Sequence, residues 1–146
     1  MKKFSFSLEK VFKFREQQLE IEMNTLALLR FELSEIEASL ERMQNLLETK
    51  QREYHEQALV GMRVHEVLEN QFFQENLKQQ IKLLEAEIQE LSIKIEKQLA
   101  VVLEFKKEVS GLEKLKEKQY EEYLEMERKA ETEFILELVS AKLVSE

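Results

Sequence analysis

The chain has no cysteine, no proline and no tryptophan, and only two glycines among its 146 residues. The absence of cysteine excludes disulfides, zinc–thiolate sites and thiol nucleophiles. A compact globule needs several chain reversals, and glycine and proline are the residues that most often make them. A sequence with so few of both therefore favours a small number of long elements over a globular fold.

The sequence also lacks the features of several functional classes. Its net charge of −8 disfavours nucleic-acid binding, which depends on clustered Lys and Arg. Two isolated glycines cannot build a phosphate-binding loop, and His55 and His65 lie ten positions apart in the sequence. No window reaches the roughly 18 apolar residues that a membrane-spanning helix needs. We expect no enzyme activity, no cofactor, no metal site and no nucleic-acid partner.

The start of the chain is basic and aromatic, with five Lys or Arg against Glu9 alone in residues 1–15. It lacks an unbroken apolar region, so we do not interpret it as a signal peptide. The lysines are interleaved with phenylalanines that cannot all face one helix. This pattern indicates a contact surface, for which we favour a protein partner over a membrane surface.

In the first half of the chain, apolar residues recur at intervals of seven, which is the signature of a coiled-coil seam. One row has no exception: Phe12, Leu19, Leu26, Leu33, Leu40, Leu47 and Tyr54. The companion row contains Leu8, Leu29, Ile36 and Met43 and is interrupted by Arg15, Glu22, Lys50 and Gln57.

A second seam follows, and its phase differs from that of the first by one residue. Its rows are Ile81, Ile88, Ile95, Val102 and Val109, and Leu77, Leu84, Leu91, Phe105 and Leu112, with Gln98 as the exception. Counting in sevens from Tyr54 predicts an apolar residue at position 82, but the apolar residue is Ile81. The phase is therefore reset between Tyr54 and Leu77.

Gly61 is the candidate for that reset, because glycine tolerates the left-handed backbone that ends many helices. Gly111, by contrast, lies inside a seam that keeps its phase. A skip in one continuous rod is the alternative to a turn. The sequence predicts an all-α fold, a single coiled-coil domain over 1–146 in which two long helices form an antiparallel hairpin. We expect helix one over about 8–59, a turn near Gly61 at about 60–62 and helix two over about 63–144.

The second helix is longer than the first, so its last thirty or so residues should overhang. They remain rich in apolar residues, including Phe134, Ile135, Leu136, Leu138 and Val139. An overhang of this composition indicates a partner, which is another copy, a different protein or a ring that surrounds it. Phe72 and Phe73 are adjacent, so only one of them can fully join the seam.

Three segments resemble the FliJ family of the bacterial flagellar export apparatus: "FSFSLEKVFKFREQQLE", "GMRVHEVLENQFF" and "EVSGLEKLKEKQYEEYLEMERKAETEF". They occur in the family's order and cover nearly the whole chain. The resemblance implies a non-enzymatic coiled coil similar to the central stalk of rotary ATPases. It also implies three partners: the hexameric export ATPase, which the stalk binds and stimulates, the large export-gate membrane protein, and export chaperones. The implied location is cytoplasmic, at the inner face of the membrane and held there only through protein partners.

The resemblance also implies contact residues. For the ATPase these are Phe4, Phe6, Lys10, Phe12, Arg15, Leu112, Leu115, Lys116, Lys118 and Tyr123. For the export gate they are Met43, Leu46, Phe73 and Leu77, with Gly61 as the turn from which they are counted. Some members have tyrosines at this patch, where this chain has Leu46 and Lys50. The alternative functions are a generic homo-oligomeric coiled-coil scaffold and a stalk or chaperone of injectisome type III secretion.

Overall fold

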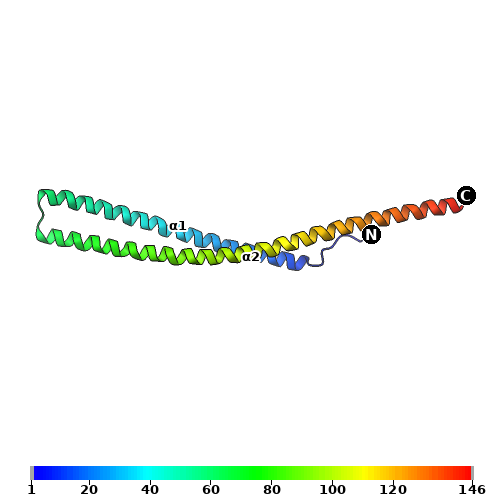
Figure 1. The fold of residues 1–146 in the computed structure, drawn as a ribbon, viewed down its shortest axis with the longest axis horizontal. Helices are drawn as coiled ribbons and strands as arrows, with labels where there is room; N and C mark the ends of the chain where they lie inside the picture. The colour runs from blue at the N-terminus through cyan, green and yellow to red at the C-terminus, as the bar shows by residue number, and fades with distance from the viewer. Residues whose placement is uncertain (1, 146) are drawn as a thin grey trace. The chain divides into compact units, whose positions relative to one another are not determined.

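Two long helices make up almost all of the protein, in a computed structural model that describes residues 2–145. Helix α1 spans Glu9–Val60 and helix α2 spans Val64–Ser145, and no strand occurs within the described residues. The two helices run antiparallel as a hairpin, so the predicted fold class is confirmed (Figure 1). With 82 residues against 52, α2 is the longer helix, as the sequence predicts.

The turn consists of residues 61–63, and Gly61 provides its unusual backbone. Its φ of 120° lies in the region that L side chains rarely adopt. The Gly61 N–H still donates to the carbonyl of Gln57 at 2.9 Å, which completes the last turn of α1. At the start of α2, the Glu66 carboxylate accepts from the Arg63 backbone N–H at 3.4 Å, which is one half of a capping box. Gly61 therefore ends one helix while Arg63 and Glu66 begin the next.

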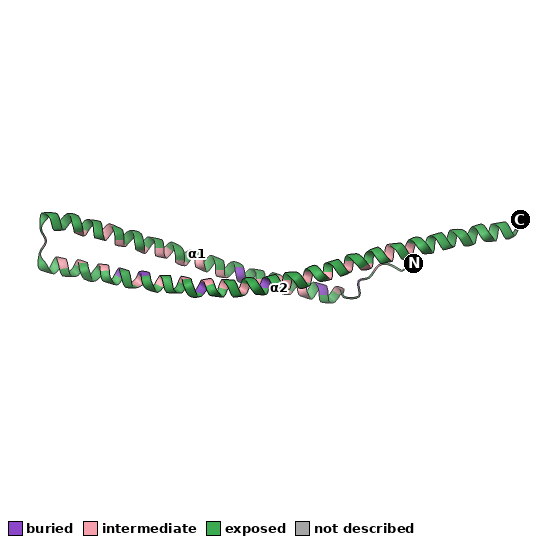
Figure 2. Ribbon diagram, in the orientation of Figure 1, coloured by how far each residue is buried: buried purple, intermediate pink, exposed green. Residues whose placement is uncertain are grey.

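The chain divides into two compact units. One contains the residues from Glu22 to Val101 and includes the turn, and the other contains the residues up to Ile21 together with those from Val102 onward. In each unit the less exposed residues form a stripe along each helix (Figure 2). All residues of the heptad rows between Phe12 and Tyr54 and between Leu77 and Leu112 are buried or half-buried, which confirms both predicted seams.

Two of the polar exceptions in the seams, Glu22 and Gln98, contact each other across the two helices. In the Glu22–Val101 unit, the side-chain amide of Gln98 donates to the Glu22 carboxylate at 2.6 Å and to the Glu22 carbonyl at 2.9 Å. Each of these two residues interrupts an otherwise apolar row. Polar residues at core positions of a coiled coil favour one alignment of the helices, because any other alignment leaves them unpaired.

Candidate functional site

The N-terminal strap, residues 2–8, is non-helical and contacts α2 through aromatic side chains. Phe4 meets Tyr120 edge-on at 5.1 Å between ring centroids and meets Tyr123 at 5.6 Å. The Tyr123 hydroxyl donates to the Lys2 carbonyl at 2.6 Å. Phe6 is buried, with 5% of its surface exposed. The aromatic side chains at the start of the chain therefore pack against α2 within the same unit.

Next to the strap, two ion pairs join the first turns of α1 to α2. Lys116 Nζ lies 3.0 Å from the Glu9 carboxylate and 5.5 Å from the centroid of the Phe12 ring. Arg15 lies 3.4 Å from the Glu108 carboxylate. All four charged side chains are partly exposed to solvent, where an ion pair contributes less than about 1 kcal/mol. Their main effect is on the alignment of the two helices.

The residues implied for ATPase contact therefore divide into three groups by exposure. Phe6 and Phe12 are buried and stabilise the hairpin, whereas Lys10, Leu115 and Lys118 are exposed and accessible. The remaining five are half-buried: Phe4, Arg15, Leu112, Lys116 and Tyr123.

A small hollow of about 460 Å³ lies beside the strap. Its walls are the rings of Phe4, Phe12 and Tyr120 with the side chains of Glu113, Lys116 and Glu117. Tyr120 is absent from the contacts expected from the sequence. Its spacing of three from Tyr123 is the signal that places both rings on one side of α2.

The residues implied for gate contact also differ in exposure. Leu77 is 5% exposed and belongs to the core between the helices, whereas Met43 is half-buried. Leu46 and Phe73 are exposed, at 39% and 41%. The neighbouring Phe72 is more exposed still, at 77%, so of the two adjacent phenylalanines it is Phe73 that lies closer to the seam.

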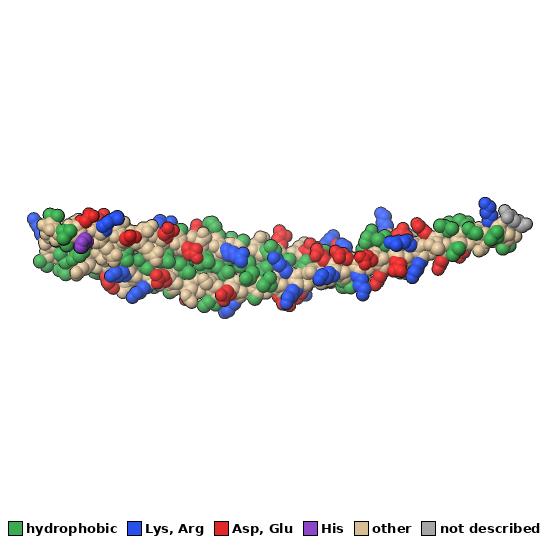
Figure 3. Space-filling model, turned by 45° about the horizontal axis from the view of Figure 1, so that its top comes forward, with side chains coloured by type: hydrophobic (Ala, Val, Ile, Leu, Met, Phe, Trp, Pro, Cys, Tyr) green, Lys and Arg blue, Asp and Glu red, His purple; other side chains and the backbone are tan. Residues whose placement is uncertain are grey.

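The end of α2 exposes many apolar side chains. Every residue from 128 to 145 is exposed. Between Phe134 and Val144 only Glu137, Ser140 and Lys142 are polar, and the bulky apolar residues of this stretch are 51% to 87% exposed. Hydrophobic side chains cover much of this end of the helix in Figure 3.

The surface offers neither an arrangement for metal chemistry nor one for crossing a membrane. Within residues 2–145, no group of three or more His, Asp or Glu side chains is placed to hold a metal ion. In the same range, no helix is both long and apolar enough to span a bilayer.

Comparison with known proteins agrees with the family suggested by the sequence. The family model described as "Flagellar FliJ protein" matches residues 4–140, which is nearly the whole chain. No curated protein and no solved structure matches the chain. With a two-helix hairpin and a family match from the strap to the exposed end of α2, the chain belongs to the FliJ family of flagellar proteins.

Proposed function

We propose that this FliJ-family protein is a non-catalytic, stalk-like component of flagellar protein export that binds and stimulates the hexameric export ATPase. In this proposal the end of α2, from Phe134 to Val144, enters the central opening of the ATPase ring. The observation that carries it is the exposed apolar surface on every side of that end.

Helix geometry explains why a ring suits this end of α2. Successive residues are rotated by about 100°, so Phe134 and Leu138 lie on one side while Leu136 and Leu143 lie on the opposite side. A helix that is apolar all round is stable in water only when it is enclosed. One partner helix would cover a single stripe, whereas a ring covers all sides at once. Each Leu, Ile or Phe that becomes fully buried contributes about 1.5–3 kcal/mol.

The proposal extends to the other partners of the family. Leu46 and Phe73, both exposed, are candidate contacts for the large export-gate membrane protein, with the half-buried Met43 beside them. Export chaperones are further proposed partners. The place of action follows from these contacts: the cytoplasmic face of the membrane at the flagellar base, reached through proteins rather than lipid.

A titration of the purified full chain into its cognate export ATPase tests the proposal. We expect binding and a rise in ATP hydrolysis that saturates with the chain, while the chain alone hydrolyses no ATP. Leu136→Glu should abolish the rise, because it places a charge in the enclosed surface. Leu28→Glu is the matched control, since Leu28 is exposed to a similar extent, 70% against 59%, on a different helix. If the wild-type chain neither binds nor alters hydrolysis, the proposal is wrong.

The alternative function is a homo-oligomeric scaffold, which the same exposed end of α2 would also serve. Sedimentation equilibrium of the chain alone distinguishes the two. A stable oligomer that dissociates on removal of residues 128–146 supports the scaffold, and a monomer supports the stalk.

A further inference from the structure

Near the turn, the seam between the two helices changes from apolar to polar. Counting back by seven from Leu77 and Ile81 reaches Asn70 and Gln74, and the companion row of α1 carries Lys50 and Gln57 there. Four heptad positions in this part of the Glu22–Val101 unit therefore carry amides or a lysine, whereas the same two rows of α2 continue with Leu77 and Leu84 and with Ile81 and Ile88. Such a local departure from the pattern that stabilises the rest of a fold is typical of a functional site.

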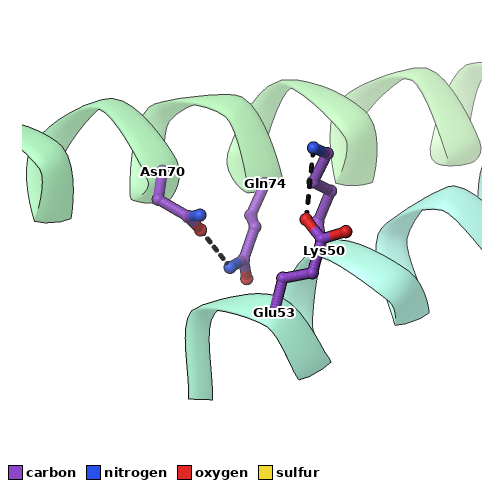
Figure 4. A network of polar contacts seen from close by, with 4 residues as sticks. All are labelled: Lys50, Glu53, Asn70 and Gln74. Atoms are coloured by element: carbon purple, nitrogen blue, oxygen red, sulfur yellow. Dashed lines mark hydrogen bonds and ion pairs between the residues drawn. The ribbon is translucent and has the colours of Figure 1, made fainter. Parts of the chain in front are cut away.

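The side chains of Lys50, Asn70 and Gln74 lie between the two helices (Figure 4). Gln74 donates to the Asn70 side chain at 2.5 Å, and Lys50 lies 3.4 Å from the Glu53 carboxylate. Each of these two contacts joins residues of a single helix, so neither ties α1 to α2. The contact that crosses the space is that of the Lys50 ammonium, 5.6 Å from the centroid of the Phe73 ring.

The result is an open hollow of about 800 Å³, here called the tip cleft, between the end of α1 and the start of α2. Protein interiors are close-packed and leave few voids larger than a water molecule. A hollow of this size is instead in the range of sites that hold a ligand. The apolar part of its lining consists of Val60, Met62 and Phe73.

The charged part of the lining is mostly acidic. Glu56, Glu66 and Glu69 line the tip cleft, against one cation, Lys50, which is already paired with Glu53. These carboxylates do not converge to form a metal site within the described residues. Carboxylates that are spread around an apolar floor fit long cationic side chains, whose charges reach different points of the rim while an apolar group fills the centre.

We propose that the tip cleft binds a basic peptide segment of a partner protein, in which a bulky apolar side chain is flanked by Lys or Arg. The apolar side chain packs against Met62 and Phe73, and the flanking cations pair with Glu56, Glu66 and Glu69. The proposal goes beyond the ATPase contact and does not depend on it, since the ATPase contact is proposed for a different stretch of α2. It shares Phe73 with the candidate gate contact and otherwise uses other residues.

The two glycines provide a direct test in the full chain. Gly61 lines the tip cleft and Gly111 does not, so a chain labelled with 15N-glycine reports binding and its control in one spectrum. The probe is a short synthetic peptide in which Phe and Leu are flanked on both sides by lysines. We expect the Gly61 resonance to shift with saturation and the Gly111 resonance to stay. An unmoved Gly61, or equal shifts of both resonances, would overturn the proposal.

Matched peptides and variants test the chemistry of recognition. A peptide with the lysines replaced by glutamates should not bind, and one with Phe and Leu replaced by serines should bind weakly. Glu56→Gln together with Glu69→Gln should weaken binding by about tenfold, because two exposed ion pairs are lost. Glu127→Gln is the control outside the tip cleft. Equal affinity for the lysine and glutamate peptides, or no effect of the double variant, contradicts the assignment.

A last variant tests whether the polar residues of the seam near the turn are needed for peptide binding. Asn70→Leu with Gln74→Leu restores the apolar rows and should raise the melting temperature while it abolishes peptide binding. Undiminished binding in this variant would contradict the proposal, as would a wild-type chain that does not bind the lysine peptide. If the variant does not fold, the glutamine substitutions and the Gly61 resonance still decide the question.

Discussion

The seam of the Glu22–Val101 unit and the end of α2 are built from the same kinds of side chain and have opposite environments. Leu91 in the seam is 5% exposed, whereas Leu136 near the C-terminal end is 59% exposed. Residue type does not explain this difference, because both are leucines on the same helix.

The difference lies in the spacing. In the seam, apolar residues return every seven positions and form one stripe, which a single antiparallel helix covers. From Phe134 to Val144 they occupy every side, and no second helix within residues 2–145 covers them. Periodicity therefore tells which apolar residues pack within the chain, and a loss of periodicity indicates which ones stay exposed.

The largest effect expected from this comparison is on folding stability. Leu91→Ala should lower the free energy of unfolding by about 2–5 kcal/mol, because it leaves a cavity in the seam. Leu136→Ala should change it by less than about 0.5 kcal/mol, as an exposed substitution does. Urea unfolding followed by circular dichroism measures both. Equal losses would show that the end of α2 is packed in the free chain.

A second prediction asks how much the polar contact in the seam matters. Gln98→Ala should cost about 1–2 kcal/mol, because the half-buried Glu22 carboxylate loses its donor. Replacing both Glu22 and Gln98 by leucine should recover that loss or exceed it, since no unpaired polar group remains. A double variant less stable than the single one would mean that the pair does more than fill two seam positions.

The two glycines offer a third prediction with opposite signs. Gly61→Ala should destabilise the hairpin by about 1 kcal/mol, because alanine is strained at a φ of 120°. Gly111→Ala should stabilise it by up to about 1 kcal/mol, because alanine is the better helix former and its added methyl group meets open space. Thermal unfolding of the two variants beside the wild type shows the signs. The same sign for both would contradict the assignment of the turn to Gly61.

The smallest effect is expected for the ion pairs, which occur both beside the seam and on the unpaired end of α2. Arg15→Gln removes the pair with Glu108, and Lys129→Gln removes the pair with Glu125. Each should cost less than about 1 kcal/mol, and the cost should diminish at high salt. A salt-independent loss for Arg15→Gln would show that its hydrogen bond to Gln18, at 3.0 Å, matters more than the charge pair.

The sequence was sufficient to predict the helices, the turn and the buried rows. These depend on local periodicity and on the backbone of one glycine, and both can be recognised without knowing which residues the opposite helix places beside them. The burial of Leu77 shows the limit of the family resemblance: a contact patch counted from Gly61 includes a residue that the heptad row already places in the core.

Contacts that depend on both helices at once could not be predicted from the sequence. The strap bonds to α2 across 121 positions of sequence, between Lys2 and Tyr123, and its non-helical backbone carries no periodic signal. The tip cleft is likewise visible only when Asn70 and Gln74 are set beside Lys50. In the sequence, each of these polar residues alone looks like any other polar residue that interrupts a coiled-coil row.

The strap and the three-residue turn have a mechanical consequence. Each unit contains its own fastening between α1 and α2, the strap in one and the turn at Gly61 in the other. Within each unit, sliding of one helix along the other is resisted, because it would pull Phe4 from its tyrosines in the first case and unwind the helix ends at the turn in the second. A pull on α2 inside either unit is therefore carried by both helices together.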